Sequence, residues 1–304
     1  MSENGEMNAQ KMTGSAQTML TWVKELESKE EIPSHYLQSI QGIPLSDPFP
    51  YTLLVPPLKN QRNKPAERLV ILIDNVLYVY EKRGRKIIPD QIKLHPGIDL
   101  EMGNALLYSW ITFRETEQGT QTHTITIPFN TATGRYFDPI IQLIKPISIT
   151  LEENPETLQN TNKNLVQADF KFNAFARECI TKDSRSINSL WQPALQKKIL
   201  HIFGKTYYQN ITLAHYFILT NQELIILWDD ENSVENRGVR YGGIRRFIPH
   251  TLISNMSVIK MEQNYCKLII KLVSGEIIEQ IFILDFHESV KQFISDFESA
   301  ATLK

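Results

Sequence analysis

Cysteine is scarce in this sequence. Only Cys179 and Cys266 occur among 304 residues, and neither has a cysteine or histidine partner at metal-ligand spacing. Two cysteines cannot build a disulfide framework, so we interpret both as buried, inert thiols and expect a cytoplasmic protein. The seven histidines are scattered, without the paired spacing of a metal site. We therefore predict neither a disulfide nor a bound metal.

Long apolar runs and a strong net charge are lacking as well. No run approaches the roughly 18–20 apolar residues that a membrane-spanning helix needs. Residues 1–15 are polar and include acids, unlike the basic start and apolar centre of a signal peptide. The net charge of −2 provides no general attraction for nucleic acid. These absences favour a soluble globular protein that binds no nucleic acid.

The motifs of common enzyme classes are missing. The chain holds no HExxH, GxSxG or phosphate-binding glycine loop, and Gly242-Gly243 is a lone pair inside a predicted hairpin. Acidic residues are plentiful, but their spacing ties no two of them to a shared site. We predict a non-enzymatic protein without a cofactor. An active site assembled from scattered residues is the alternative left open.

The strongest feature present is an internal repeat. Residues 85–92 (RKIIPDQI) reappear as residues 245–252 (RRFIPHTL), and the match continues without a gap to Phe113 and Val273. Upstream, residues 69–80 match residues 216–228, with one extra residue in the turn. A repeat of this length exceeds the roughly 20–50 residues of a solenoid unit, so it indicates a duplicated domain.

The first copy has the pattern of antiparallel strands separated by turns. Asp74-Asn75 and Gly103-Asn104 are predicted to form hairpin turns. The predicted strands are residues 51–55, 69–73, 76–80, 86–88, 98–102, 105–113 and 121–129. Before them, residues 1–14 are expected to be disordered. Residues 15–31 are expected to form an amphipathic helix that packs on its own domain, docks on a partner or lies on a membrane.

Each copy is predicted to end in one amphipathic helix. The apolar residues at helical spacing are Phe137, Ile140, Ile141 and Ile144 in the first copy and Val290, Phe293, Ile294 and Phe297 in the second. Residues 166–180 favour a helix or a package of turns. Phe170, Phe172 and Phe175 are expected to pack in a core or between domains, with a ligand cage as the alternative. Strands of the second copy are predicted to begin with residues 200–203 and 206–209. The predicted organisation is a tail and helix (1–45), a first domain (46–150), a linker (151–164) and a second domain (165–304).

This order of elements resembles the pleckstrin-homology (PH) superfold. Residues 68–80 (RLVILIDNVLYVY) resemble its second and third strands, and residues 215–228 and 240–249 resemble the bacterial PH and GRAM-like subgroup. The resemblance covers roughly residues 46–146 and 165–299. It implies a mainly β protein with α-helices: two tandem, strongly bent antiparallel sandwiches or barrels, each closed by a C-terminal amphipathic helix.

The resemblance also implies a binding function, because PH-like domains mainly bind phosphoinositide head groups, peptides or other domains. In lipid-binding members, basic side chains of the first two hairpin loops hold the phosphates. The corresponding residues of the first copy are Lys59, Arg62, Lys64, Arg68, Lys82, Arg83, Arg85 and Lys86. The first loop of the second copy, residues 210–214, is uncharged, so no phosphate site is expected there. The alternative for the first copy is that lysine and arginine at hairpin tips serve solubility and edge protection.

Two hypotheses about function follow. In the first, the protein is a scaffold that binds a protein or peptide, either along an exposed strand edge or in a groove beside Phe293 and Phe297. In the second, the basic loops bind an anionic lipid head group or another polyanion, with peripheral attachment to the inner face of the membrane. The apolar frame repeats while the loop chemistry does not, which predicts a division of labour between the copies.

Overall fold

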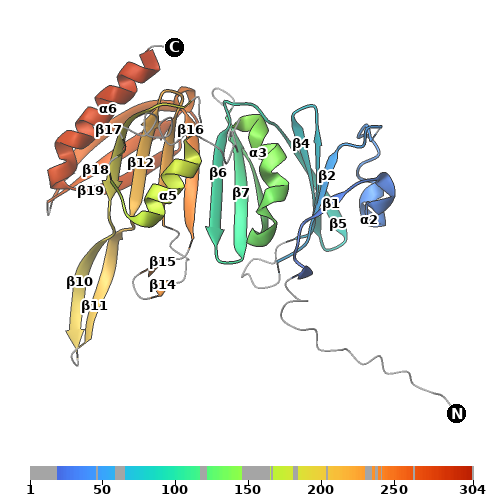
Figure 1. The fold of residues 1–304 in the computed structure, drawn as a ribbon, viewed down its shortest axis with the longest axis horizontal. Coiled ribbons are helices and arrows are strands. Elements are labelled where there is room, and N and C mark those ends of the chain that lie inside the picture. The colour runs from blue at the N-terminus through green and yellow to red at the C-terminus, as the bar shows by residue number, and fades with distance from the viewer. Residues whose placement is uncertain are drawn as a thin grey trace, which may run out of the picture.

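The computed structural model is mainly β, with several antiparallel sheets and a helix at the C-terminal end (Figure 1). This architecture confirms the coarse fold class. The structure describes residues 19–45, 47–58, 66–116, 122–145, 165, 167–180, 184–202, 205–229, 235–236, 239–240, 242–262 and 264–302. The predicted disordered segment 1–14 and linker 151–164 lie outside these residues. Within them, no sheet closes into a barrel and no helix has the length and apolar character needed to cross a membrane.

A five-stranded antiparallel sheet forms the first part of the first repeat. Its strands, in spatial order, are β1 (Lys24–Leu26), β2 (Tyr51–Val55), β3 (Arg68–Ile73), β4 (Val76–Arg83) and β5 (Lys86–Lys93). The predicted turn at Asp74-Asn75 is confirmed: these residues join β3 to β4 with φ values of 46° and 65°, the pair of positive φ angles that a tight two-residue turn needs. Pro89 is tolerated because β5 is an edge strand.

The predicted helix over residues 15–31 is wrong at Lys24–Leu26, which form β1 against β2. A 3-10 turn, η1 (Lys29–Glu31), and the short helix α2 (Ser34–Leu37) follow. Val23 packs in the central core, whereas Leu26 packs in a smaller core with Tyr36. The apolar spacing that fits a helix also fits a short strand followed by a turn, and pairing with β2 decides between them.

Three further strands and a helix complete the first repeat. They are β6 (Asp99–Ala105), β7 (Tyr108–Glu115), β8 (His123–Asn130), the 3-10 turn η2 (Thr131–Phe137) and α3 (Asp138–Ile144). The closing helix is confirmed, but the turn predicted at Gly103-Asn104 is wrong, because the chain turns at Leu106-Leu107 instead. Gly103 lies inside β6 because Trp110 packs across it. A Cβ at Gly103 would lie 2.0 Å from Cζ2 of Trp110.

The second repeat has the same order of elements. Counted from β2 in the first repeat and from β9 in the second, each has four strands, then three strands, then a helix. The elements of the second repeat are α5 (Phe170–Cys179), β9 (Ser186–Gln192), β12 (His215–Thr220), β13 (Glu223–Trp228), β16 (Gly243–Pro249), η3 (His250–Leu252), β17 (Ile253–Met261), β18 (Tyr265–Leu272), β19 (Ile277–Ile283), η4 (Leu284–Phe286) and α6 (His287–Thr302). The predicted helix within residues 166–180 and the closing helix are both confirmed, whereas β9 was not predicted.

A long hairpin interrupts the second repeat between β9 and β12. Its strands, β10 (Leu195–Ile202) and β11 (Lys205–Thr212), form a separate two-stranded sheet that projects from the body (Figure 1). We call this hairpin the arm. The strands predicted at residues 200–203 and 206–209 fall within it, apart from Phe203, which lies outside the described residues. A smaller hairpin, β14 (Glu235–Asn236) and β15 (Val239–Arg240), joins β13 to β16.

The two repeats share one sheet. β6 of the first repeat pairs antiparallel with β16 of the second, giving a seven-stranded sheet in the order β8–β7–β6–β16–β13–β12–β9. The side chain of Asn104 accepts a hydrogen bond from the backbone N of Gly243 at 3.0 Å. Gly242 beside it has φ +97°, and a Cβ there would lie 2.0 Å from the O of Asn104. The glycine pair therefore lets the two strands approach each other.

A common hydrophobic core spans this junction. Helices α3 and α5 lie over the same face of the seven-stranded sheet (Figure 1), and Ile140 of α3 and Phe172 of α5 belong to one continuous cluster of buried side chains. The prediction that Phe172 packs in a core is confirmed, but Phe170 is 90% exposed. A second cluster lies under α6. Phe293 and Phe297 are buried in it, so neither side chain is open to a partner.

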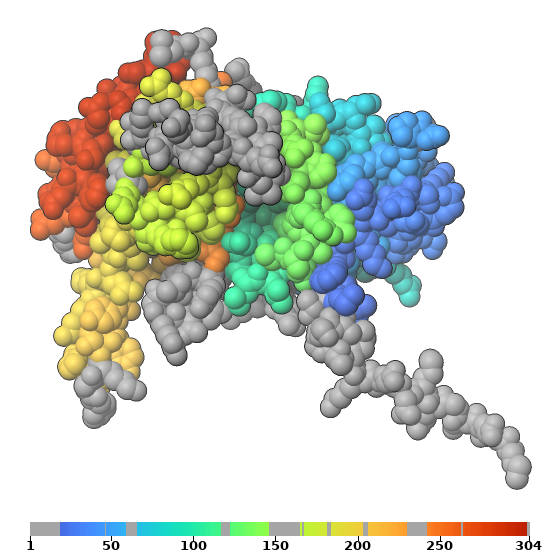
Figure 2. All heavy atoms as spheres, viewed as in Figure 1, coloured from blue at the N-terminus to red at the C-terminus, as the bar shows by residue number. Residues whose placement is uncertain are grey.

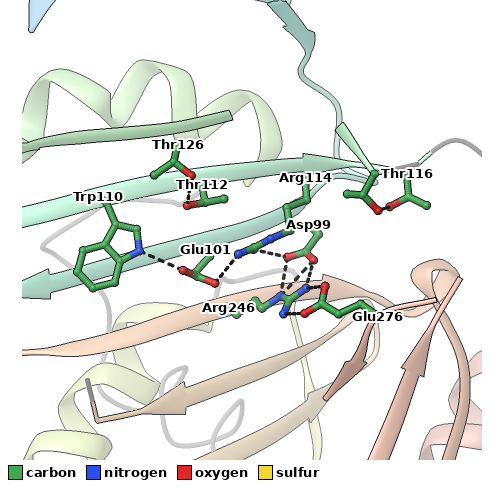
Figure 3. A network of polar contacts seen from close by, with 10 residues as sticks. Asp99, Glu101, Trp110, Thr112, Arg114, Thr116, Thr126, Arg246 and Glu276 are labelled. Atoms are coloured by element: carbon green, nitrogen blue, oxygen red, sulfur yellow. Dashed lines mark hydrogen bonds and ion pairs between the residues drawn. The ribbon is translucent and has the colours of Figure 1, made fainter. Parts of the chain in front are cut away.

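Charged side chains reinforce the junction (Figure 3). Arg246 of β16 donates from Nη2 to Oδ2 of Asp99 in β6 at 2.5 Å, and from Nη1 to Oε1 of Glu276 at 2.6 Å. Arg114 of β7 extends the network to Glu101 at 2.8 Å. Burial opposes the charge of Arg246, but the hydrogen bonds to Glu276 and Asp99 outweigh it and raise the pKa of the guanidinium. Arg246, which follows the hairpin loop in the sequence, is therefore part of the junction.

Candidate functional site

Five of the eight predicted anion-binding residues lie in the described part of the chain, around the turn between β4 and β5. These five are Arg68, Lys82, Arg83, Arg85 and Lys86. The other three belong to the connection between β2 and β3 and lie outside the described residues; they are Lys59, Arg62 and Lys64. Four of the five described residues belong to the β4–β5 hairpin, and Arg68 begins the neighbouring strand β3.

Acidic neighbours pair with three of these five residues. Arg68 is buried, and its Nη2 donates to Oε2 of Glu81 at 2.6 Å. Arg83 donates from Nε to the same carboxylate. Lys82 Nζ lies 3.8 Å from Oε1 of Glu67. Burial opposes the charge on Glu81, but the hydrogen bonds from both arginines hold its pKa below the usual value. Part of the basic character read from the sequence is thus neutralised within the fold.

Arg85 and Lys86 are different. Both side chains are exposed, and within the described part of the chain neither forms an ion pair or a hydrogen bond. Beside them is a shallow cleft of about 470 Å³, lined by Pro57, Ala66, Glu67, Glu81, Lys82, Arg83 and Gly84. An anion bound at this rim would gain two unpaired cations, but it would also approach two carboxylates.

The corresponding end of the second repeat has different chemistry. A cleft of about 460 Å³ lies at the base of the arm. Two carboxylates line it, and the described residues of its lining include no lysine or arginine; these residues are Ile211, Thr212, Leu213, His215, Trp228, Asp229, Ile244, Glu279, Gln280 and Ile281. Asp229 accepts a hydrogen bond from Lys171, and Glu279 accepts one from Lys267 at 2.8 Å. Each carboxylate retains further acceptor positions.

His215 lies at the bottom of this cleft and is 1% exposed. The rings of Phe217 and Phe282 meet it edge-on, with centroids 5.7 and 4.8 Å away. Its Nδ1 donates to the O of Leu213 at 2.9 Å, and its Nε2 is buried without a partner. Burial lowers the pKa of His215 to about 4. The imidazole is therefore neutral at pH 7.

The arm presents apolar side chains to solvent, and Figure 2 shows it standing clear of the body. Its exposed apolar residues, which are 42–60% accessible, are Ile199, Leu200, Ile202, Tyr207 and Tyr208. Leu200 pairs directly with Tyr207, and Ile202 lies two residues further along β10. These three side chains therefore share one face of the ribbon. At the base, Oγ1 of Thr212 donates to Oε1 of Gln280 at 3.4 Å.

A third exposed group lies at one corner of the first repeat, and we call it the apolar corner. It consists of Met19, Leu20, Trp22, Leu106 and Leu107, which are 40–59% exposed. Two hydrogen bonds bring its two segments together. Asn130 Nδ2 donates to Oγ1 of Thr21 at 2.8 Å, and the N of Thr131 donates to the O of Leu107 at 3.0 Å.

The turn of the apolar corner is strained. Leu106 has a φ of 55°, in the left-handed region that costs a leucine roughly 1–2 kcal/mol. Glycine or asparagine relieves such strain in two-residue turns. Leucine at this position therefore lowers stability while it adds exposed apolar surface, a combination that is typical of binding sites.

Neither cysteine is placed for chemistry. Both thiols are buried, and burial raises the pKa of Cys179 to about 11. In the described ranges, no group of three or more His, Cys, Asp and Glu side chains is placed to hold a metal ion. No protein-family model and no curated protein matches the sequence. The function has to be inferred from the exposed surfaces.

The basic turn was predicted from the sequence, whereas the arm and the apolar corner were not. A signal for the arm was present: Ile199 directly precedes the strand predicted to begin at Leu200, and adjacent strand residues point to opposite faces. Both cannot be buried by a single core, unless a bulge intervenes. The apolar corner had no such signal, because Leu106-Leu107 fits the interior of a strand as well as a turn.

Proposed function

We propose that this chain is a non-enzymatic binding protein, built from two PH-like units, that docks on a protein partner through the apolar corner. The PH-like character is supported by the order of elements in each repeat. Four antiparallel strands, three antiparallel strands and a helix are what the resemblance implies. Because this superfold serves unrelated partners, the choice of partner has to be argued from the surface.

The apolar corner is the observation that carries this proposal. Five large apolar side chains are exposed together, and such patches on soluble proteins mark interaction sites. None of the five is basic, which favours apolar contact with a protein over attraction to an anionic lipid. The support beneath the patch is firm, because Leu106 and Leu107 follow β6, an interior strand of the seven-stranded sheet.

Photo-crosslinking in the native cells tests the proposal. A photoreactive residue at Leu107 or Trp22 should capture a discrete protein, and Leu106→Asp should abolish that adduct. A matched control is Ile88, which is apolar, 39% exposed and located on β5. Adducts that are the same at Leu107 and Ile88, or no adduct at Leu107 and Trp22, would contradict the proposal.

A second candidate function is anion binding at the β4–β5 turn, and the unpaired Arg85 and Lys86 favour it. Each basic residue near an anionic membrane contributes roughly 1 kcal/mol. Two such residues give weak binding that depends strongly on salt. The paired Arg68, Lys82 and Arg83 add less, because Glu81 and Glu67 already neutralise them.

Flotation with vesicles that contain anionic lipid, over a salt series, tests this second function. Arg85→Glu with Lys86→Glu should remove binding at low salt. The matched control is Lys260→Glu with Lys271→Glu, which changes the net charge equally at two exposed positions of the second repeat. Equal loss of binding in both double variants would point to general charge attraction and against a site.

A further inference from the structure

The arm is a ribbon whose apolar residues are not covered by its own body. Each strand has 8 residues, which corresponds to a length of roughly 27 Å at about 3.4 Å per residue. An isolated two-stranded hairpin is at best marginally stable in water. An arm of this length with Leu200, Ile202 and Tyr207 on one face is therefore expected to pack against another surface.

The charges of the arm indicate what kind of surface this is. Residues 195–212 contain Lys197, Lys198 and Lys205 and no acidic residue. The arm thus contributes +3 to a net charge of −2, so the rest of the chain carries −5. A surface that complements the arm needs apolar side chains and carboxylates together.

The cleft at the base of the arm has this composition. Ile211, Leu213 and Ile281 supply apolar walls. Asp229 and Glu279 supply carboxylates, each of which has one lysine partner and further acceptor positions for a lysine of the arm. The cleft is lined by the last residues of β11, so the arm of the same chain leads away from it. A chain cannot fold its own straight arm back into this cleft, but the arm of another copy can reach it.

We propose that the arms of two copies pack antiparallel about a two-fold axis, so that the outer part of each arm covers the cleft at the base of the other. A two-fold arrangement makes each contact twice, which suits a surface that carries both complementary parts. The apolar faces around Leu200 and Tyr207 of the two arms meet near the axis. This inference goes beyond the proposed function, because it uses neither the apolar corner nor the basic turn.

A membrane surface is the competing occupant, since tyrosine, isoleucine and lysine also suit a lipid interface. The cleft decides in favour of a second copy. A membrane would cover the arm but would leave the apolar and acidic cleft at its base unused.

Sedimentation velocity over a concentration series tests the dimer. The full chain should sediment as a dimer, and Leu200→Asp with Tyr207→Asp should convert it to a monomer that keeps the circular dichroism spectrum of the folded chain. The matched control is Ile259→Asp on β17, because Ile259 is 46% exposed and Leu200 is 47% exposed. A wild-type chain that is monomeric at every concentration overturns the proposal. Binding to anionic vesicles that depends on Leu200 and Tyr207 also overturns it.

Cysteine crosslinking tests the antiparallel register. Both native cysteines are buried, so introduced ones can be labelled selectively. A mixture of the Ile202→Cys and Gln280→Cys chains should form a mixed dimer with a short bifunctional maleimide, because Ile202 lies at the outer end of β10 and Gln280 lines the cleft. A mixture of Ile202→Cys and Lys291→Cys should not, because Lys291 lies on α6. A crosslink between two Ile202→Cys chains without one to Gln280→Cys overturns the antiparallel register. Capture of a partner at the apolar corner should not change in these variants, so failure here is distinct from failure of the proposed function.

Discussion

Corresponding positions of the two repeats differ in electrostatic character. The repeat alignment places Arg68 at the start of β3 opposite His215 at the start of β12. Arg68 is charged and paired with Glu81 at 2.6 Å, whereas His215 is neutral and packed between phenylalanine rings. The first repeat continues into an exposed basic turn. The second continues into a cleft with carboxylates and a projecting arm.

This difference shows which parts of a duplicated fold are free to change. Ile71 of β3 and Ile218 of β12 are both fully buried, and a change of volume at such a position is costly. Turn residues and hairpin lengths carry no such constraint. The repeats therefore keep one arrangement of strands and present different chemistry at its ends.

Breaking the ion-pair network between the two repeats should have the largest effect on stability. Arg246→Ala leaves Asp99 buried without its partner and should lower the free energy of unfolding by about 3–5 kcal/mol. The adjacent Arg245 is the control. It pairs with Glu178, which is 58% exposed, so Arg245→Ala should cost at most about 1 kcal/mol. Denaturant titration measures both losses, and equal values would show that the network does not hold the junction.

The neutral His215 should make stability depend on pH. Its pKa is about 4 in the folded state against 6.5 in the unfolded chain, so the unfolded state binds more protons between these values. Lowering the pH from about 7 to about 4 should therefore cost about 3 kcal/mol through this group. In His215→Phe the loss over this range should be smaller by that amount. Identical pH profiles for both proteins would show that His215 is not held neutral.

The Trp110 ring leaves no space for a side chain at Gly103 of β6. Gly103→Ala places a Cβ against the Trp110 ring and should destabilise the protein by about 1–3 kcal/mol. Gly42→Ala is the control, because a Cβ there meets nothing within 4 Å. Thermal unfolding of the two variants compares them directly. A Gly103→Ala protein as stable as Gly42→Ala would contradict the packing described for the junction.

Relieving the strain at Leu106 should have the smallest effect on stability, and in the opposite direction. Leu106→Asn should raise the free energy of unfolding by about 0.5–1 kcal/mol, because asparagine adopts positive φ at lower cost. The same change should weaken capture of a partner at Leu107. A variant that is more stable and captures the partner equally well would separate the strain from the binding surface.

The parts of the fold that depend on local sequence were predictable. Asp74-Asn75 specifies its turn, and the spacing of Ile140, Ile141 and Ile144 specifies α3. The exposed Arg85 and Lys86 were also recognised, because a hairpin tip is exposed wherever the strands lie. Each of these features is determined by a few neighbouring residues.

The parts that depend on pairing between distant strands were not predictable. Nothing near Arg246 in the sequence shows that β16 pairs with β6, and this pairing turns a loop-flanking arginine into a buried one. Gly103 was read as a turn residue, because the Trp110 ring that requires glycine there becomes adjacent only after β6 and β7 pair. Whether the arm is exposed likewise depends on how far the seven-stranded sheet extends beside it.

The central claim is that the two repeats form one body and differ only in the chemistry at its ends. The most direct test is to follow the unfolding of each repeat separately. Variants that retain only Trp110, in β7, or only Trp191, in β9, report on the first and second repeat respectively. The shared sheet and core predict that both fluorescence signals change at the same denaturant concentration with the same slope. Two transitions with separate midpoints would show that the repeats fold independently, and would contradict the account.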